Sequence, residues 1–398
     1  MVNPELKRYV EDEIIPGYAS FDKAHREDHA RTVISRSFDI ARAVEYRTGA
    51  LDDDVIYAAA AFHDTGLVDG REVHHLSSGR IIRADARLRE WFDEKTVELI
   101  AQAAEDHRAS SDHMPRSIYG CILAEADRLI DPLVIIRRTV QFGLSHYPQL
   151  DREGHWQRTL EHLHEKYADG GYLKLMVPES DNAARLEELR VIIREHDAAG
   201  PEAGETRLRD LFDRAYQRQA VLDFLNAEGI DYEIYEHPPI FTIEEALAYW
   251  KDIDRCVHCK NLFMRNHKGN RHYLISFECH KTFDIHALEH ALHQGKLSFA
   301  SPERMMRCLG LKPGSVSAFG LINDIEPVGA VTGDGKAADP KELFENGHRV
   351  KFYADRQLLE AERISFHPCD NMASVVVTRE SFLRFLELWG GEVEWLDI

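Results

Sequence analysis

A change of hydrophobic period near residue 200 divides this chain into two parts. From Asp22 to about His196, apolar residues recur at spacings of three and four, which is the period of an amphipathic helix. After Gly229, short runs rich in β-branched and aromatic residues alternate with helical patterns. Residues 197–206 contain a Gly-Pro pair and lack an apolar period. The pattern predicts an all-α helical bundle followed by a mixed α/β domain.

The predicted domains are residues 1–197 and 219–398, joined by a linker and connecting helix at 198–218. A length of 398 residues supports two domains, because one hydrophobic core seldom organises so long a chain. Helices of the first domain are expected at His29–Val44, Asp53–His63, Lys95–His107 and Ser117–Ile130. Strands are expected later at Tyr232–Tyr235, Cys256–Met264, Arg271–Phe277, Val316–Leu321, Val350–Tyr353 and Ser374–Thr378. Further helices are expected at Arg207–Glu228, Thr242–Tyr249, Ile285–His293, Pro302–Leu309 and Arg379–Trp389.

The charge of the chain limits what it can bind. Its net charge is -20, and residues 219–398 hold 19 Lys and Arg against 28 Asp and Glu. A broad nucleic-acid-binding face needs clustered cations, so we expect no DNA partner and only a local contact with RNA. The basic residues that crowd together are Lys260, Arg265, His267, Lys268, Arg271 and His272.

Targeting signals and cysteine usage indicate the compartment. The first 15 residues lack the apolar core of a secretory signal, and no stretch is long and apolar enough to span a bilayer. Six cysteines are too sparse for the disulfide framework of a small secreted domain, and they fit a reducing compartment. We expect a cytoplasmic protein that contacts no membrane.

Histidines and aspartates on the predicted helices form a first candidate site. His29 lies at the start of one helix, His63 and Asp64 end an apolar helix, and Asp127 lies near the end of another. Neutral imidazoles with carboxylates suit a divalent first-row metal. Such a metal lowers the pKa of bound water and polarises a phosphoryl oxygen, so the set predicts phosphoester hydrolysis.

The order of these residues resembles that of the HD-domain metal-dependent phosphohydrolases, from about Phe21 to Asp197. The resemblance implies that a divalent metal is held by His29, His63, Asp64 and Asp127. It also implies that a second metal or the phosphate is held by His74, His75 and His107. Mn, Fe, Mg, Ni and Zn are not distinguished, and the small phosphoester, a nucleotide among the options, stays open. The alternatives are an ordinary polar surface and an HD fold that binds metal without turnover.

Five stretches of the second domain place polar residues or glycine beside predicted strand ends, where α/β folds build sites. They are Glu236–Thr242, Lys260–Phe263, Leu297–Pro302, Gly314–Asp324 and Phe366–Asn371. Their order resembles the YbaK/ProX family, the free-standing relatives of the editing domain in bacterial prolyl-tRNA synthetase. The match spans nearly all of Ala220–Ile398, and the ProX-type branch, which clears alanine from proline tRNA, is the most similar.

The resemblance implies that this domain hydrolyses mischarged tRNA and contacts the tRNA acceptor end. Lys260 would contact the terminal adenosine or its phosphate, and Asn261 and His367 would place the substrate. The loop from Gly314 would supply backbone donors to the carbonyl oxygen. Substrate binding is also expected from Phe241, Thr242, Phe299, Ser301 and Asn323. No cofactor is expected for this domain, because an aminoacyl ester is already activated.

Ala318 departs from the family pattern, which commonly has proline four residues after the loop glycine. Proline would make this loop more rigid, so the amino acid that is removed stays open. Another feature, Cys256–Cys259 followed by Cys279-His280, has one spacing typical of zinc ligands. Because no second close cysteine pair follows, we favour small buried thiols.

Three functions remain open. The leading one is a two-module hydrolase, in which a phosphohydrolase is fused to a tRNA deacylase. The second is an HD nucleotide phosphohydrolase whose second domain only binds or senses aminoacyl-tRNA or an amino acid. The third is a non-catalytic adaptor that binds tRNA or a synthetase.

Overall fold

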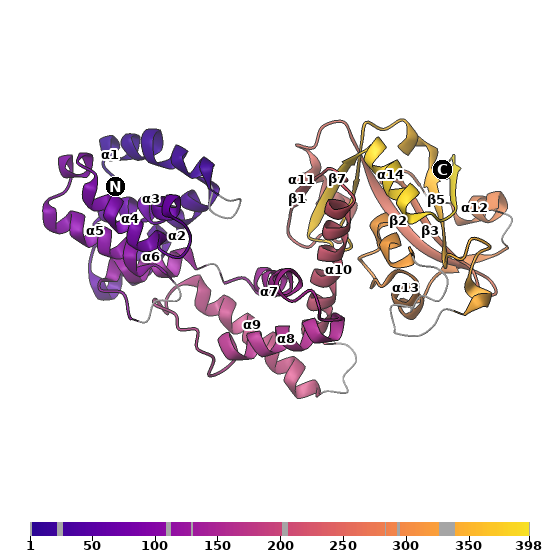
Figure 1. Ribbon diagram of the computed structural model, residues 1–398, viewed down its shortest axis with the longest axis horizontal. Helices are drawn as coiled ribbons and strands as arrows, with labels where there is room; N and C mark the ends of the chain where they lie inside the picture. Colours follow the sequence, from indigo (N-terminus) through magenta and orange to yellow (C-terminus); the bar gives the residue numbers. More distant parts are fainter. Residues whose placement is uncertain are drawn as a thin grey trace. The chain divides into compact units, whose positions relative to one another are not determined.

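The structure is a computed structural model that describes residues 2–21, 27–108, 113–128, 130–200, 206–282, 284–292, 295–325 and 339–397. The chain divides into two compact units (Figure 1). The first unit is Met1–Ile135 with Gln157–Arg207, and the second is Ile136–Trp156 with Leu208–Ile398. This division does not coincide with the predicted boundaries, because residues 136–156 group with the second unit. Part of the predicted linker, residues 201–205, lies outside the described residues.

The first unit is helical, as predicted. Its helices are α1 (Pro4–Tyr9), α2 (Glu27–Thr48), α3 (Asp53–Phe62), α4 (His74–Ala84), α5 (Glu94–Asp106), α6 (Ile118–Asp127) and α9 (Asp181–Ala199). Short helical turns are η1 (Val10–Ile14), η2 (Ile15–Ser20), η3 (Thr65–Asp69) and η4 (Arg87–Glu90). Helices α7 (Pro132–His146) and α8 (Arg152–Lys166) each cross from one unit to the other.

Capping and burial explain where these helices lie. The side chains of Asp52, Asp93 and Ser117 accept hydrogen bonds from backbone N–H groups in the first turns of α3, α5 and α6. Every residue from Val55 to Phe62 is buried, so α3 is surrounded on all sides by the core. The residues that follow α3 therefore emerge at the edge of a packed core, where their positions are well defined.

The second unit is a mixed sheet with helices. Its strands are β1 (Tyr232–Glu236), β2 (Cys256–Asn266), β3 (His272–Glu278), β4 (Leu297–Phe299), β5 (Val350–Asp355), β6 (Arg363–Phe366), β7 (Ala373–Thr378) and β8 (Val393–Leu396). They follow the order β1-β7-β6-β2-β3-β5-β8, and β4 pairs with β2. The pairs β2–β6, β3–β5 and β5–β8 are parallel, whereas the others are antiparallel.

Helices pack on both faces of this sheet. They are α10 (Arg207–Ala227), α11 (Ile243–Trp250), α12 (Ile285–Leu292), α13 (Pro302–Leu309) and α14 (Arg379–Trp389), with the short turns η5 (Ala318–Asp324), η6 (Pro340–Glu342) and η7 (Arg356–Leu359). Helices α10, α13 and α14 share one core with Phe263 and Leu274, whereas α12 shares another with Met264 and Tyr273. Neighbouring strand residues thus enter opposite cores, as the alternation of a strand requires.

The sheet opens along one edge of β2. Strand β6 pairs with residues 256–258 of that edge, and β4 pairs with residues 264–266. Between them, residues 259–262 have no partner strand on this edge within the described part of the chain. This opening presents Lys260 and Asn261 where two neighbouring strands diverge, which is a common place for a binding site in α/β folds.

One predicted strand is wrong and three strands were not predicted. Val316–Leu321 is not a strand, because the Ser317 side chain caps η5 and Ala318, Phe319 and Leu321 are all buried. A run that is buried on every side lacks the alternation of a half-buried strand. The unpredicted strands β4, β6 and β8 have only three or four residues each, too few to show a period of two.

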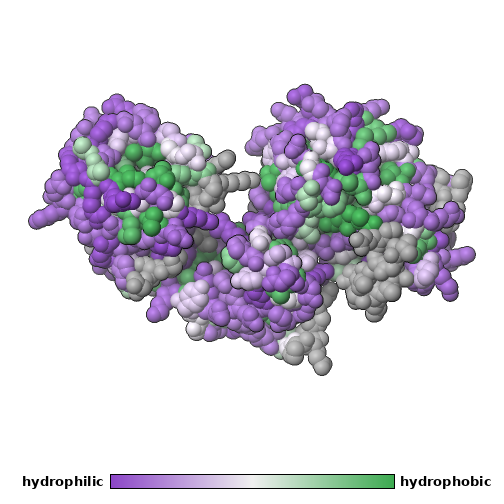
Figure 2. Space-filling view, in the orientation of Figure 1, coloured by the Kyte–Doolittle hydropathy of each residue, from purple (hydrophilic) through white to green (hydrophobic). Residues whose placement is uncertain are grey.

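The surface of each unit is mainly hydrophilic in Figure 2, with smaller apolar areas. Large apolar side chains that are exposed include Phe241 and Phe299, which are 78% and 63% exposed. Among the described residues, no helix combines the length and apolar character needed to cross a membrane.

Candidate functional sites

The four predicted metal ligands of the first unit come together. His29 projects from α2, His63 and Asp64 follow α3, and Asp127 ends α6. His29 Nε2 lies 3.2 Å from Asp127 Oδ1 and 3.5 Å from Asp64 Oδ2. His63 Nε2 lies 3.2 Å from Asp64 Oδ2 and 3.3 Å from His29 Nε2. The arrangement gathers imidazole and carboxylate donors in one small volume.

A second group of donors shares the same aspartate. His74 Nε2 and His107 Nε2 each lie 3.5 Å from Asp64 Oδ1, and they lie 3.1 Å from each other. The two oxygens of Asp64 therefore face two histidine pairs, so Asp64 would contribute one oxygen to an ion held at each pair. His75, which was predicted with them, lies outside both groups and contacts the ring of His74 at 5.5 Å between centroids.

Backbone hydrogen bonds orient three of these histidines. The Nδ1 atoms of His63, His74 and His107 each lie 2.5–2.8 Å from the carbonyl oxygen of the residue three positions earlier. An Nδ1–H that donates to a carbonyl leaves the Nε2 lone pair directed into the site, which is the tautomer that a metal needs. Because these lone pairs face one another, the donor set fits a divalent cation.

The charges of these side chains also favour a bound cation. Burial opposes ionisation of Asp64, but the neighbouring histidines hold its pKa well below the usual range. Burial also opposes protonation of His29, but hydrogen bonds to Asp127 and Asp64 raise its pKa to about 9. The site thus retains negative carboxylates and attracts positive charge, which a proton or a metal ion can supply.

A cavity of about 330 Å³ opens beside these donors. Asp64, His74, His107 and Asp127 line it, together with two cations that were not predicted, Arg71 and Arg108. The Arg108 guanidinium donates to the carbonyl oxygen of Glu72 at 2.6 Å. Arginine binds phosphate oxygens well because its planar fork offers several donors. The cavity therefore combines four of the predicted metal or phosphate ligands with two guanidinium groups, which are suited to phosphate.

Gly66 lets the turn that follows His63 and Asp64 pack closely against the start of α4, where His74 lies. A Cβ atom at this buried position would lie 2.1 Å from the carbonyl oxygen of His74 and 2.4 Å from the backbone nitrogen of Ser78. Only glycine lets η3 approach α4 this closely, and its N–H donates to Ser78 Oγ at 2.9 Å.

We expect Gly66→Ala to lower the free energy of unfolding of the first unit by roughly 1–3 kcal/mol, the usual cost of overpacking. It should also weaken metal binding, because the backbone of His74 must move. Urea denaturation and metal titration measure the two effects. Gly17→Ala is the matched control, since its Cβ would meet nothing within 4 Å. Equal stability and metal affinity in both variants would contradict this role of Gly66.

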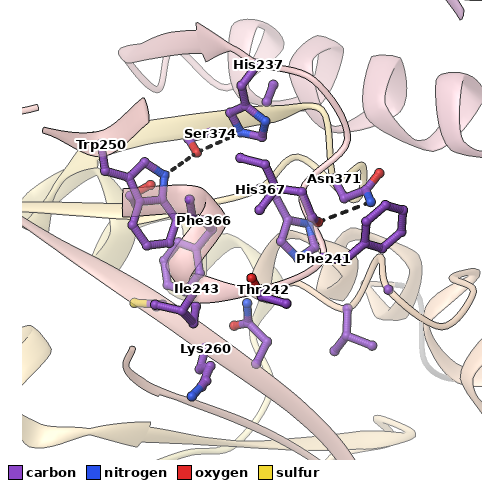
Figure 3. Close-up of a pocket in the computed structure, with 18 of the residues that line it drawn as sticks. His237, Phe241, Thr242, Ile243, Trp250, Lys260, Phe366, His367, Asn371 and Ser374 are labelled. Carbon is purple, nitrogen blue, oxygen red and sulfur yellow. Dashed lines mark hydrogen bonds between the residues drawn. The ribbon is translucent and has the colours of Figure 1, made fainter. Parts of the chain in front are cut away.

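The second unit contains a cavity of about 520 Å³ at the opening of the sheet. Six of the nine residues predicted for this site line it: Phe241, Thr242, Lys260, Asn261, Gly314 and His367. They come from the loop before α11, from β2, and from the loops that follow α13 and β6. Figure 3 shows His367 and Thr242 between the flanking side chains of Trp250 and Phe241, with Lys260 at one side.

Lys260 and Asn261 offer donors at the opening. Lys260 is exposed, and no carboxylate among the described residues forms an ion pair with it. The Ser276 hydroxyl donates to Asn261 Oδ1 at 2.6 Å, which leaves the amide NH₂ of Asn261 as the group that can donate to a ligand. The strand therefore presents one free cation and one oriented amide.

Two loops complete the donors. Gly314 has φ +83°, the left-handed conformation that favours glycine, and Ser315 N–H closes a turn onto the Lys312 carbonyl at 3.0 Å. Burial lowers the pKa of His367 to about 4, so its imidazole is neutral at neutral pH. Its Nδ1 atom is buried and has no hydrogen-bond partner among the described residues.

One wall of the cavity is a hydrogen-bonded chain that was not predicted. The Trp250 Nε1–H donates to Ser374 Oγ at 2.9 Å, and His237 Nε2 lies 3.2 Å from the same oxygen (Figure 3). Trp250 also stacks on His258, with ring centroids 4.1 Å apart. These bonds join α11, β7 and the end of β1, so they give the cavity a fixed shape. No short motif links residues this far apart in the sequence.

Comparison with known proteins assigns both units. The family model described as "Aminoacyl-tRNA editing domain" matches residues 237–385, and the one described as "HD domain" matches residues 26–130. The prolyl-tRNA editing protein ProX of Acetoanaerobium sticklandii is 31% identical over 182 residues, which are 46% of this chain and 97% of that protein. The chain belongs to the aminoacyl-tRNA editing family. The match to the HD model gives it an HD domain as well, and the two families make it a hydrolase.

Further comparisons give one more relative and one solved structure. The prolyl-tRNA synthetase associated domain-containing protein 1 of Mus musculus is 29% identical over 170 residues, 42% of this chain and 87% of that protein. A solved structure of a predicted HD superfamily hydrolase from an uncultured Thermotogales bacterium is 22% identical in sequence. The match covers 39% of this chain and 82% of the chain in that structure. Its TM-score is 0.26, too low to bear on the fold.

Three predicted residues do not line the cavity of the editing domain. Phe299 is an exposed residue of β4, and Ser301 caps α13 by accepting a hydrogen bond from the Arg304 N–H. The Asn323 amide donates to the carbonyl oxygen of Leu309 at 2.7 Å and to Gln217 Oε1 at 3.2 Å. Their expected role in substrate binding stays a prediction.

The crowded basic residues of the editing domain are not one patch. Lys260 and Arg265 are five positions apart on β2, so their side chains leave opposite faces of the sheet. Arg265 and Arg271 donate to backbone carbonyl groups around the turn between β2 and β3. The prediction of a single basic footprint is therefore wrong, and Lys260 is the member that borders the cavity.

The cysteines of the editing domain are free thiols. Glu278, Cys279 and His280 lie close together, and a bond of 2.6 Å between His280 Nδ1 and Glu278 Oε1 accounts for that closeness. This group does not include Cys256 or Cys259.

Proposed function

We propose that the chain is a two-module hydrolase. Its editing domain hydrolyses the ester of a mischarged tRNA, and its HD domain hydrolyses a small phosphoester with a divalent metal ion. The observation that carries the first proposal is the meeting of Lys260, Asn261, Gly314 and His367 around one cavity. Relatives named as prolyl-tRNA editing proteins support it.

In the proposed deacylation, a water oxygen attacks the carbonyl carbon of the aminoacyl ester. The bond from that carbon to the ribose oxygen breaks, and the ribose oxygen takes up a proton. Lys260 binds the terminal adenosine or its phosphate, and Asn261 donates to the substrate. The N–H groups of the Gly314 loop stabilise the developing negative charge on the carbonyl oxygen. Because His367 is neutral, it serves as a hydrogen-bonding group that places the substrate.

Alanine on proline tRNA is the substrate that we favour. Ile243, Ala246, Val316 and Ala373 are among the residues that line the cavity, and these apolar residues suit an apolar side chain on the substrate. Ala318 is buried at the start of η5 and is not among the residues that line the cavity. The departure from the family pattern at Ala318 would thus act on specificity only through the loop that precedes it.

A panel of mischarged tRNAs tests the deacylase. The full-length protein is incubated with proline tRNA carrying alanine, cysteine or proline, and release of the labelled amino acid is measured. We expect fastest release from alanyl-tRNA for proline and little from prolyl-tRNA. If every charged tRNA in the panel remains intact, the editing domain is not a deacylase.

In the HD domain, His29, His63, Asp64 and Asp127 would hold one metal ion, and His74 and His107 with Asp64 would hold a second. A bound divalent ion would supply Lewis acidity and an activated water. Arg71 and Arg108 would bind the phosphate oxygens at the mouth of the cavity. A panel of nucleotides and other phosphoesters, assayed with each candidate metal, tests the reaction. Release of no phosphate or alcohol from any of them would overturn it.

A further inference from the structure

The two loops that carry His367 and Gly314 need support from elsewhere, because neither lies in a strand. The first loop turns sharply: the Cys369 N–H donates to the His367 carbonyl oxygen at 2.9 Å, and Cys369 has φ +60°. A buried residue other than glycine in the left-handed region is strained and persists only when its surroundings hold it. The second loop turns at Gly314.

Helix α10 holds the Gly314 loop through one arginine. Arg214 donates from Nη1 to Ser315 Oγ at 2.7 Å and from Nη2 to the carbonyl oxygen of Pro313 at 3.4 Å. The position where a Cβ of Gly314 would lie is 4.0 Å from the same Nη1 atom. Asp210, one turn earlier on α10, accepts from Arg214 Nε at 2.8 Å and so orients the guanidinium.

The same helix holds the His367 loop through a second arginine. Arg218 Nη1 lies 3.3 Å from Asp370 Oδ2, and Arg218 also pairs with Glu236, the residue before the cavity-lining His237. The side chains of Arg218 and Asp370 are 3% and 0% exposed. This ion pair is therefore buried directly behind the loop.

Arg214 and Arg218 are four residues apart, so they share one face of the helix. Gln217, between them, accepts from Asn323 of η5. One helix thus contacts three segments behind the cavity, although α10 ends before the residues that match the editing model begin.

The Arg218–Asp370 pair is poorly arranged for stability alone. Asp370 Oδ1 and Arg218 Nε are buried and have no hydrogen-bond partner among the described residues. Burial raises the pKa of Asp370 against the opposing effect of Arg218. A buried pair with unsatisfied atoms contributes little net stability compared with apolar residues of the same size, but it does select one loop position.

We propose that Arg214 and Arg218 are positioning residues of the editing site, acting through Ser315 and Asp370 on the loops that carry Gly314 and His367. Helix α10 is then part of the editing site. This inference rests on the proposed deacylase function. Loss of either arginine is expected to slow the chemical step, because a displacement of catalytic donors by about 1 Å can lower a rate about 100-fold.

The test uses the full-length protein and alanyl-tRNA for proline. Arg218→Met leaves Asp370 unpaired, whereas Arg218→Met with Asp370→Leu removes both charges and restores stability. We expect both variants to lower kcat by about 10- to 100-fold with little change in KM. A lower melting temperature is expected only in the single variant. Arg116→Met, which leaves the buried carboxylate of Asp106 in the first unit without its arginine, is the control and should retain the kcat of deacylation.

Amide hydrogen exchange of the same variants gives a readout that does not need activity. Exchange should accelerate at residues 366–371 in the Arg218 variants and at 312–317 in Arg214→Met, but not in β3. A double variant with the kcat of the wild-type protein overturns the inference. If the wild-type protein itself hydrolyses no mischarged tRNA, the proposed function fails. Hydrogen exchange alone then tests the positioning role, and unchanged exchange in both loops of the variants would overturn it.

Discussion

Lys260→Ala is expected to lower kcat/KM for deacylation of alanyl-tRNA for proline by about 10- to 150-fold. A hydrogen bond to a charged group is worth about 1.5–3 kcal/mol, which corresponds to this range. Lys260 is exposed and has no ion pair among the described residues, so its removal leaves no buried group unsatisfied. The loss should therefore appear in activity and not in the melting temperature.

The control for this prediction is Lys268→Ala. Lys268 is also an exposed lysine of the same unit, but it lies in the turn between β2 and β3 and does not line the cavity. It should retain the wild-type kcat/KM at fixed ionic strength. Equal activity in the Lys260 and Lys268 variants would show that the cation at the cavity does not bind the substrate.

Asp64→Ala is expected to abolish tight binding of divalent metal by the HD domain and, with it, phosphoester hydrolysis. Asp64 contributes one oxygen to each histidine pair, so its loss removes a ligand from both groups at once. Metal content is measured by elemental analysis after dialysis, and phosphate release is measured separately. Deacylation should remain at the wild-type rate, because the residues of the proposed deacylation all lie in the editing domain.

Two further variants separate the groups. His29→Ala should remove the ion held with His63, and His74→Ala should remove the ion held with His107. Asp69→Ala is the control, since Asp69 is exposed and pairs with Arg80 on the surface. Two ions per chain in the wild-type protein and one in each histidine variant are expected. Full metal content in Asp64→Ala would show that the ions bind elsewhere.

The grouping of the four predicted metal ligands could be expected from sequence, because each lies near a helix end within a recognisable local pattern. His63 and Asp64 are consecutive residues after α3, and the fold then brings His29 and Asp127 beside them. Arg71 and Arg108 gave no such signal, since a single arginine in a loop beside a helix end is ordinary. His75 lies outside both groups of donors, and the role that the family resemblance implies for it stays a prediction.

The editing cavity was predicted in part, for reasons that lie in its geometry. Lys260, Gly314 and His367 belong to short sequence motifs, although in the structure only His367 directly follows a strand. Ser374 and Trp250 belong to the wall through a hydrogen bond between elements 124 residues apart, which no local pattern reveals. The clustering of basic residues in the sequence did not indicate a single basic surface, because Lys260 and Arg265 lie on opposite faces of one strand.

Hydrophobic periodicity alone does not define the boundary between the two units. Helical patterns end and begin near residue 200, and this predicts a change of fold there. The pattern cannot show that residues 136–156, within helices α7 and α8, group with the second unit. The contacts responsible join distant segments: Trp156 packs on Phe212 with ring centroids 5.1 Å apart, and Arg137 pairs with Glu236 at 3.0 Å.

The most direct test measures release of alanine from alanyl-tRNA for proline by the full-length protein, with and without a chelator that strips the HD domain of metal. Two separate hydrolytic sites predict rapid release of alanine at the same rate in both conditions, while phosphoester hydrolysis stops in the chelator. Intact alanyl-tRNA in both conditions, or deacylation that ceases with the chelator, would contradict this account.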